Sequence, residues 1–120
     1  MDPDELKKRT KHFGLRIIRL VESLPSNKVV TTTGNQLLRC GTSVGANYRS
    51  ACRGRSKPDF IAKVGIAIEE ADESLYWMEL LIEAGFVKEE HLKPLMQEAD
   101  EFIAILTSSV TTARSNLSKN

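Results

Sequence analysis

The chain has 120 residues, of which 41% are hydrophobic and 28% are charged, and its formal net charge is +1. This length leaves room for one domain rather than two, and the composition is typical of a globular protein. No apolar run approaches the roughly 20 residues that span a bilayer, and the charged N-terminus lacks the apolar core of a signal peptide. We therefore expect a single domain, residues 1–120, in the cytoplasm and without a membrane partner.

Charge is distributed unevenly along the chain. Residues 1–63 contain 13 Lys or Arg and 5 Asp or Glu, a net charge of +8, whereas residues 64–120 contain 4 and 11, a net charge of −7. A head-to-tail contact would set the basic side of one copy against the acidic side of the next, and such contacts close into rings. The asymmetry therefore favours a cyclic homo-oligomer over a two-fold dimer, which would oppose like charges near its axis.

The first predicted helix covers residues 3–24. Asp2 has the character of an N-cap, and Pro3 suits the first helical position. Pro25 ends the segment. Between these signals the apolar residues fall on one face at helical spacing, and they are Leu6, Phe13, Ile17, Leu20, Val21 and Leu24.

The second predicted helix covers residues 34–55, because Thr33 and Gln36 have the spacing of a capping box. The β-branched run before it has no partner strand, so we expect an extended loop there. Gly41 and Gly45 lie on the apolar stripe, and each glycine costs about 1 kcal/mol relative to alanine in a helix. Another helix must approach closely at these glycines, either within the subunit or across an interface.

The third predicted helix covers residues 57–84, with Ser56 as its cap and Gly85 as the residue that ends it. It carries more apolar residues than one core-facing stripe needs. The extra residues either widen the arc that faces the core or form an interface with another copy. These candidate interface residues are Ile66, Trp77, Leu80 and Ala84, with Trp77 as the anchor.

The fourth predicted helix covers residues 88–113, and we expect a frayed tail over residues 114–120, because Ser and Thr propagate helices poorly. The helices are joined by short connections, which make neighbours antiparallel. The sequence therefore predicts an all-α protein, an antiparallel up-down-up-down four-helix bundle.

The basic residues of the second helix admit two interpretations. An antiparallel pairing of the second and third helices sets Arg39 opposite Glu73, so we predict a structural ion pair there. If it is buried, its disruption strands a charge and is costly. The remaining cations form either a solvated face or a nucleic-acid-binding surface, since a phosphate backbone needs spaced cations. The candidate nucleic-acid-binding residues are Arg49, Arg53, Arg55 and Lys57.

The sequence contains no recognisable catalytic or metal-binding pattern. No histidine has a partner in the sequence, and no phosphate-cradling glycine loop is present. Glu69, Glu70 and Glu73 form an acidic cluster, but a carboxylate metal site in a bundle needs Glu-x-x-His pairs. Cys40 and Cys52 lie about 18 Å apart on one helix, too far apart for a disulfide. We therefore predict no enzymatic activity, no cofactor, no metal and no small-molecule substrate.

Three segments carry a resemblance to a known family. They are the second-helix run from Gln36 to Asn47, the turn from Arg53 to Ser56 and the third-helix run from Tyr76 to Leu81. These segments resemble the small bacterial proteins first associated with intervening sequences in 23S ribosomal RNA genes. One departure is Ser50, where many members of that family carry a glutamate.

The resemblance implies a four-helix bundle that assembles into a ring-like homopentamer and has no enzymatic activity. It also implies a fold shared with accessory proteins of the reverse transcriptase of diversity-generating retroelements, which bind nucleic acid through a strongly basic surface. We therefore expect a homo-oligomeric scaffold that binds RNA or DNA non-specifically. The alternative is a nucleic-acid-binding accessory factor to a reverse transcriptase or to RNA-processing machinery, a role that the nearly neutral net charge supports less well.

Overall fold

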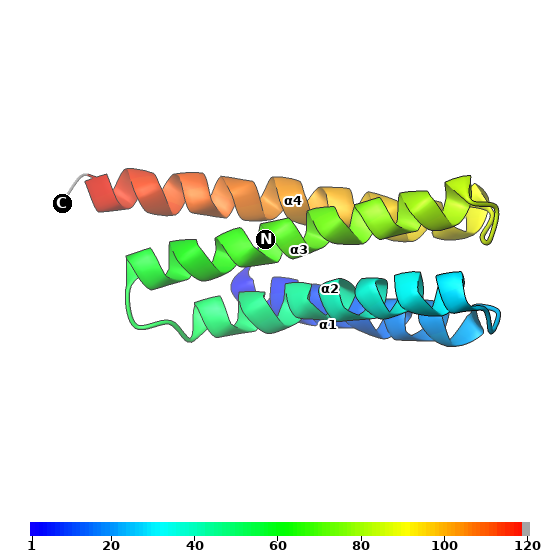
Figure 1. The fold of residues 1–120 in the computed structure, drawn as a ribbon. Coiled ribbons are helices and arrows are strands. Elements are labelled where there is room, and N and C mark those ends of the chain that lie inside the picture. The colour runs from blue at the N-terminus through cyan, green and yellow to red at the C-terminus, as the bar shows by residue number, and fades with distance from the viewer. Residues whose placement is uncertain (119–120) are drawn as a thin grey trace.

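The computed structural model describes residues 1–118 as an antiparallel four-helix bundle, which confirms the predicted fold class (Figure 1). The helices are α1 (Pro3–Ser23), α2 (Lys28–Cys52), α3 (Lys57–Glu83) and α4 (Glu89–Ser118). In Figure 1, α1 and α2 form one layer and α3 and α4 the other, and the α2–α3 turn lies at the end opposite the other two connections. The bundle measures 53 × 21 × 21 Å.

Side-chain caps fix the beginnings of α1 and α3. Asp2 Oδ1 accepts hydrogen bonds from the backbone N–H groups of Asp4 at 2.8 Å and Glu5 at 3.1 Å. Ser56 Oγ accepts one from the N–H of Asp59 at 3.2 Å. These bonds satisfy donors that have no partner within the helix, which is why both helices begin where the sequence predicts.

α2 begins at Lys28, six residues before the predicted start at 34, so the expected loop is helical instead. Asn27 is the actual cap, and its Oδ1 accepts from the N–H groups of Val29 at 2.9 Å and Val30 at 3.3 Å. Val30 is fully buried. Burial of an apolar face together with a good cap outweighs the weak helix propensity of a β-branched run.

α4 continues to Ser118, beyond the predicted end at 113, so residues 114–118 are helical rather than frayed. The predicted tail extends to 120, and residues 119 and 120 lie outside the described part of the chain. A hydroxyl group in this segment bonds back to the preceding turn, since Ser118 Oγ donates to the carbonyl of Ser115 at 3.1 Å. Such bonds give Ser and Thr polar partners within the helix itself.

The core lies between the two layers and is centred on two phenylalanines. Phe13 of α1 and Phe102 of α4 meet edge to face, with ring centroids 5.4 Å apart. Phe102 and Leu95 are buried on α4, whereas Met96 and Ile103 are only partly buried. The core face of α4 is therefore centred on the side of the helix that carries Phe102.

The two glycines of α2 allow α1 to approach closely within the subunit. A Cβ atom at Gly41 would lie 2.8 Å from Cγ1 of Ile17, and one at Gly45 would lie 3.2 Å from the backbone of Thr10. A Cβ at Gly14 of α1 would meet Cα of Thr42 at 3.6 Å. Of the two explanations for these glycines, close packing inside the subunit is therefore the correct one.

Within residues 1–118, no helix combines the length and the apolar character that crossing a bilayer requires.

Candidate functional site

A basic groove runs along the outer side of the α1–α2 pair. Its walls contain Leu15 and Ile18 of α1, which are exposed, and Thr42 and Ala46 of α2. The floor is the close approach of the two helices at their glycines. The hollow has a volume of about 680 Å³. Four cations line it, and we name this feature the α1–α2 groove, with Lys7, Lys8, Lys11 and Arg49 as its cations.

No acidic side chain lines the α1–α2 groove. The reason lies in the sequence, which has no Asp or Glu from Leu6 to Val21 and none from Ser23 to Pro58. Lys7 makes one long ion pair at the surface, in which its Nζ lies 3.7 Å from Oδ1 of Asp4. Within residues 1–118, Arg49 makes no ion pair, so its charge is open to an external partner.

The outward face of α3 has the opposite character. The chain from Val64 to Val87 contains six acids and no Lys or Arg. Apolar side chains stand beside these acids, with Ile66 43%, Tyr76 54% and Leu80 37% exposed. We name this face the α3 ridge, and it comprises Ile66, Glu69, Glu73, Tyr76, Trp77 and Leu80.

Arg39 of α2 holds one edge of the α3 ridge. Its Nη1 donates to Glu70 Oε2 at 2.9 Å, and its Nη2 donates to Glu73. Partial desolvation opposes the charge of Arg39, but the attraction of Glu70 and then Glu73 outweighs it, so the pKa of Arg39 lies above its ordinary value. Trp77 Nε1 in turn donates to Glu73 Oε2 at 3.3 Å, which fixes the indole ring on the ridge.

The structure therefore forms the Arg39–Glu73 pair that the antiparallel register predicts, but the pair is not buried. The side chain of Arg39 is 49% exposed and that of Glu73 38% exposed. Exposed ion pairs contribute little to stability, because water and salt screen them. The costly disruption expected of a buried pair does not apply here, and that expectation is corrected.

A second arginine, Arg9, also binds two glutamates, and it joins the first and last helices in a contact that the sequence did not reveal. We call each of these groups, an arginine with its two glutamates, an arginine clamp. Arg9 Nε donates to Glu98 Oε2 at 2.8 Å, and its Nη2 donates to Glu101 at 2.8 Å. Its guanidinium carbon lies 5.3 Å from the ring centroid of Phe102. The hydrogen bond to Glu98 is the largest influence on the pKa of Arg9 and raises it, despite partial desolvation.

Comparison with known proteins adds a family to this geometry. A family model described as the 23S rRNA-intervening sequence protein matches residues 4–108. The chain belongs to the 23S rRNA-intervening sequence protein family. This finding confirms the resemblance that residues of the second and third helices carry. The fold of the chain, a small helical bundle, agrees with it.

A solved structure of similar fold supports the assignment. It is a protein of unknown function from the S23 ribosomal protein family of Bacteroides thetaiotaomicron, with a TM-score of 0.86 and 34% sequence identity. The alignment covers 92% of the present chain and 99% of the other chain. No curated protein matches the present chain significantly.

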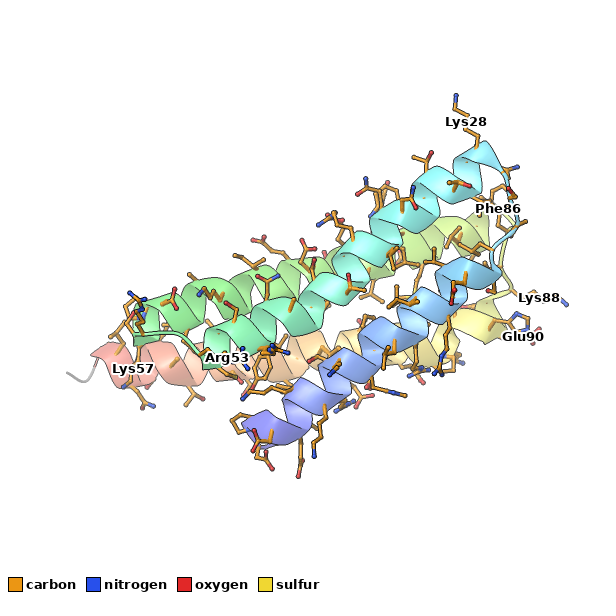
Figure 2. All side chains as sticks on the ribbon, turned by 90° about the horizontal axis from the view of Figure 1, so that it is seen from below. Lys28, Arg53, Lys57, Phe86, Lys88 and Glu90 are labelled. Atoms are coloured by element: carbon orange, nitrogen blue, oxygen red, sulfur yellow. The ribbon has the colours of Figure 1, made fainter. Side chains whose placement is uncertain are left out.

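The structure separates the four candidate nucleic-acid-binding residues of this family member. Arg49 lines the α1–α2 groove, whereas Arg53 is the C-cap of α2 and Arg55 lies in the turn that follows. Figure 2 shows Arg53 and Lys57 near the end of the bundle opposite Lys28. The candidates therefore fall into one groove residue and a cluster of three at the α2–α3 turn.

The candidate interface residues of this family member share one side of α3. Ile66, Trp77 and Leu80 belong to the α3 ridge, and Ala84 is the exposed C-cap one turn beyond Leu80. Trp77 is half-buried, because it also packs against the core. The sequence missed Tyr76, the most exposed aromatic residue of the ridge. Its only sequence signal is its position next to Trp77, and the two rings meet edge to face at 5.2 Å.

The interior of this family member contains few reactive groups. The buried polar residues are Thr10 and Ser74, whose hydroxyls donate to the carbonyls of Leu6 at 2.9 Å and Glu70 at 2.8 Å. Burial raises the pKa of the Cys40 thiol to about 11. Among residues 1–118, no three His, Cys, Asp or Glu side chains are grouped so that they could hold a metal ion.

Proposed function

We propose that this member of the 23S rRNA-intervening sequence protein family is a non-enzymatic subunit of a ring-shaped homo-oligomer that acts as a scaffold in the bacterial cytoplasm. The observation that carries the proposal is the α3 ridge. A helix that exposes Ile66, Tyr76 and Leu80 along one side is typical of a surface that another protein covers. The family resemblance adds the number of subunits, five.

The absence of catalysis is supported by the state of the polar side chains. The hydroxyls of Thr10 and Ser74 bond to carbonyls of their own helices, which leaves them no general base. The thiol of Cys40, with a pKa of about 11, is protonated at neutral pH and is a poor nucleophile. These groups are suited to packing rather than to chemistry.

The assembly is tested by light scattering coupled to size-exclusion chromatography at micromolar protein concentration and moderate salt. The proposal predicts a single species with a mass several times the 13.4 kDa of one chain, and five times that mass if the family resemblance holds. A monomer or a dimer under these conditions contradicts the ring.

A second candidate function, non-specific binding of RNA or DNA, is favoured by the cations at the α2–α3 turn. Arg53, Arg55 and Lys57 are exposed, and within residues 1–118 none of them makes an ion pair. Arg49 precedes Arg53 by about one helical turn, so it can extend the same basic surface. Phosphate contacts made by such residues release counterions, so binding would weaken steeply with added salt.

The test is a gel shift with single-stranded RNA and duplex DNA at low salt. Replacement of Arg49, Arg53, Arg55 and Lys57 by glutamine is expected to abolish the shift. A matched variant that removes four exposed cations elsewhere should retain it, and suitable positions are Arg19, Lys28, Lys88 and Lys93. No shift with the wild type, or an equal shift with both variants, contradicts nucleic-acid binding through this surface.

A further inference from the structure

The α1–α2 groove and the α3 ridge have opposite charge and lie on different sides of the subunit. α2 packs against both α1 and α3, while α1 and α3 do not pack against each other within residues 1–118, so these two helices lie diagonally across the bundle. A surface on α1 and a surface on α3 cannot meet within one copy. Each therefore remains available to a second molecule.

The two surfaces also correspond in length. The α1 wall of the groove runs from Lys7 to Ile18, about 17 Å at 1.5 Å per residue. The α3 ridge runs from Ile66 to Leu80, about 21 Å on the same basis. Both surfaces are straight because both are built on uninterrupted helices, so one can lie along the other over three to four turns, as in other helix-in-groove contacts.

The order of residues along each surface is similar as well. In the groove, Leu15 and Ile18 form an apolar stretch next to a basic stretch at Lys8 and Lys11. On the ridge, Tyr76, Trp77 and Leu80 form an apolar stretch next to an acidic stretch at Glu69 and Glu73. Ile66 lies beyond the acidic stretch, at the other end of the ridge. Apolar can therefore meet apolar while acid meets base in the same orientation.

We propose that the α3 ridge of one copy docks into the α1–α2 groove of the next copy, head to tail. This inference rests on the proposed homo-oligomeric function and names its contact surfaces. It sets Glu69 and Glu73 toward the groove cations Lys8, Lys11 and Arg49, and it covers the exposed apolar side chains of both surfaces. The contact is heterologous, so repetition of it generates a ring when the rotation between copies closes.

Two features favour a second copy over a nucleic acid as the occupant of the groove. A phosphate backbone would satisfy the lysines but would leave Leu15 and Ile18 against a charged, hydrated partner. The acidic ridge would remain exposed as well. Docking of the ridge covers all of these groups at once, and a self-matching contact of either surface would oppose like charges.

The side chains at the centre of the α3 ridge are also ordered before docking. Arg39 binds Glu70 and Glu73, and Glu73 accepts from the indole of Trp77, so the central side chains are already ordered in the subunit. Ordering side chains before association lowers the entropic cost of binding. This gives the exposed Arg39 clamp a role in assembly that its small effect on subunit stability does not suggest.

The inference assigns Arg49 to the subunit contact rather than to nucleic acid. In the assembled protein the neighbouring ridge covers Arg49, while Arg53, Arg55 and Lys57 stay exposed at the α2–α3 turn. A nucleic acid that binds the assembly would then contact these three residues.

The test reverses charge in the groove and measures mass by light scattering. The variant carries Lys11→Glu and Arg49→Glu, two exposed positions, and its control carries Lys88→Glu and Lys93→Glu, which make the same change of charge away from the groove. We expect the groove variant to have the mass of one chain, 13.4 kDa, and the control to assemble like the wild type. Circular dichroism checks that each variant remains helical.

A second pair of variants covers the case in which the groove variant does not fold. Tyr76→Ala with Leu80→Ala removes apolar area from the ridge, and Val29→Ala with Leu117→Ala removes apolar side chains that are exposed elsewhere. The ridge pair is expected to raise the concentration needed for assembly by about tenfold or more, as the loss of anchoring side chains does at other interfaces, and the control pair to leave it unchanged.

Each result has a distinct meaning. An assembled wild type whose groove and ridge variants assemble equally well overturns this inference and leaves the homo-oligomer in place. A monomeric wild type overturns both. If the wild type is monomeric and the groove variant loses its gel shift with nucleic acid, the groove is a phosphate-binding surface and the docking proposal is wrong.

Discussion

Arg9 and Arg39 make the same contact in two different surroundings. Each arginine holds two glutamates that lie three residues apart on a neighbouring helix, Glu98 and Glu101 for Arg9 and Glu70 and Glu73 for Arg39. The side chain of Arg9 is 24% exposed and that of Arg39 is 49% exposed, whereas Glu98 and Glu70 are similarly shielded, at 16% and 15%. The chemistry is equal, so the difference in the solvent access of the two arginines decides what each clamp does.

The helix–helix contacts beneath the two clamps, which we call the α2–α3 seam and the α1–α4 seam, differ too. α2 and α3 pack closely along their length, with Ser74 Oγ 3.3 Å from the Cys40 sulfur in the buried contact. α1 and α4 approach each other much less closely, and Arg9 lies over the ring of Phe102 where they meet. Arg9 therefore helps to hold the bundle closed, and Arg39 mainly orders the surface of α3.

The largest expected effect comes from removing the ring beneath Arg9. Phe102→Ala deletes the edge-to-face contact with Phe13 and leaves a cavity under the guanidinium, at a cost of about 3–5 kcal/mol in the free energy of unfolding. Urea denaturation at a fixed protein concentration measures this cost. A loss below about 1 kcal/mol, the level of a surface substitution, would show that the α1–α4 seam contributes little.

The second effect comes from Arg9 itself. Arg9→Ala removes charge-assisted hydrogen bonds to Glu98 and Glu101 and leaves Glu98 poorly solvated, so we expect a loss of about 1–3 kcal/mol. Arg9→Lys should recover only part of it, because an ammonium group lacks the planar fork that bonds two carboxylates. Equal stability of the wild type and Arg9→Ala would remove the contrast between the clamps.

The third effect is smaller. Arg39→Ala should lower the thermal midpoint less than Arg9→Ala does, because Arg39 itself is half-exposed and its charge is screened by water. The same variant should weaken assembly, because Glu73 and Trp77 lose their fixed positions on the ridge. An Arg39→Ala protein that is destabilised as strongly as Arg9→Ala, yet assembles normally, would reverse the roles of the two arginines.

A pH dependence of the α2–α3 seam is expected as well, and it is confined to alkaline pH. Burial raises the pKa of Cys40 from its ordinary value of 9.0 to about 11. The unfolded chain therefore loses this proton at a lower pH than the folded chain, and stability falls as the pH rises from 9 to 11. Cys40→Ala should show a smaller fall in thermal midpoint over that interval. The raised pKa of buried Tyr48 acts in both proteins and cancels in the comparison. Parallel curves for the two proteins would contradict the prediction.

The sequence predicts the fold well because its signals are local. Asp2, Ser56 and Gly85 mark three helix boundaries, and each makes the predicted backbone contact or turn; Gly85, for instance, has a φ of +83°. The start of α2 was missed because the T-x-x-Q spacing at Thr33 imitates a cap, whereas Asn27 stands before a run with weak helix propensity. Only the burial of Val30 in the folded bundle decides between them.

The candidate site is less predictable because it depends on distant residues. The Arg39–Glu73 contact follows from the register of two consecutive helices, but its exposure does not. Arg9 and Glu98 are separated by 89 positions and meet only when the bundle closes. The α1–α2 groove likewise combines lysines of α1 with Arg49 of α2, and its floor depends on glycine contacts that no spacing in one helix reveals.

The head-to-tail contact between the α3 ridge and the α1–α2 groove is tested most directly by mixing two variants that are each impaired in one surface, at a concentration below the one at which either assembles alone. The groove variant, Lys11→Glu with Arg49→Glu, keeps its ridge, and the ridge variant, Tyr76→Ala with Leu80→Ala, keeps its groove. Only one contact can form between them, so an equimolar mixture should give a one-to-one complex of twice 13.4 kDa that grows no further. If the mixture contains only separate chains, or if each variant alone forms the wild-type assembly, the contact lies elsewhere and the account is wrong.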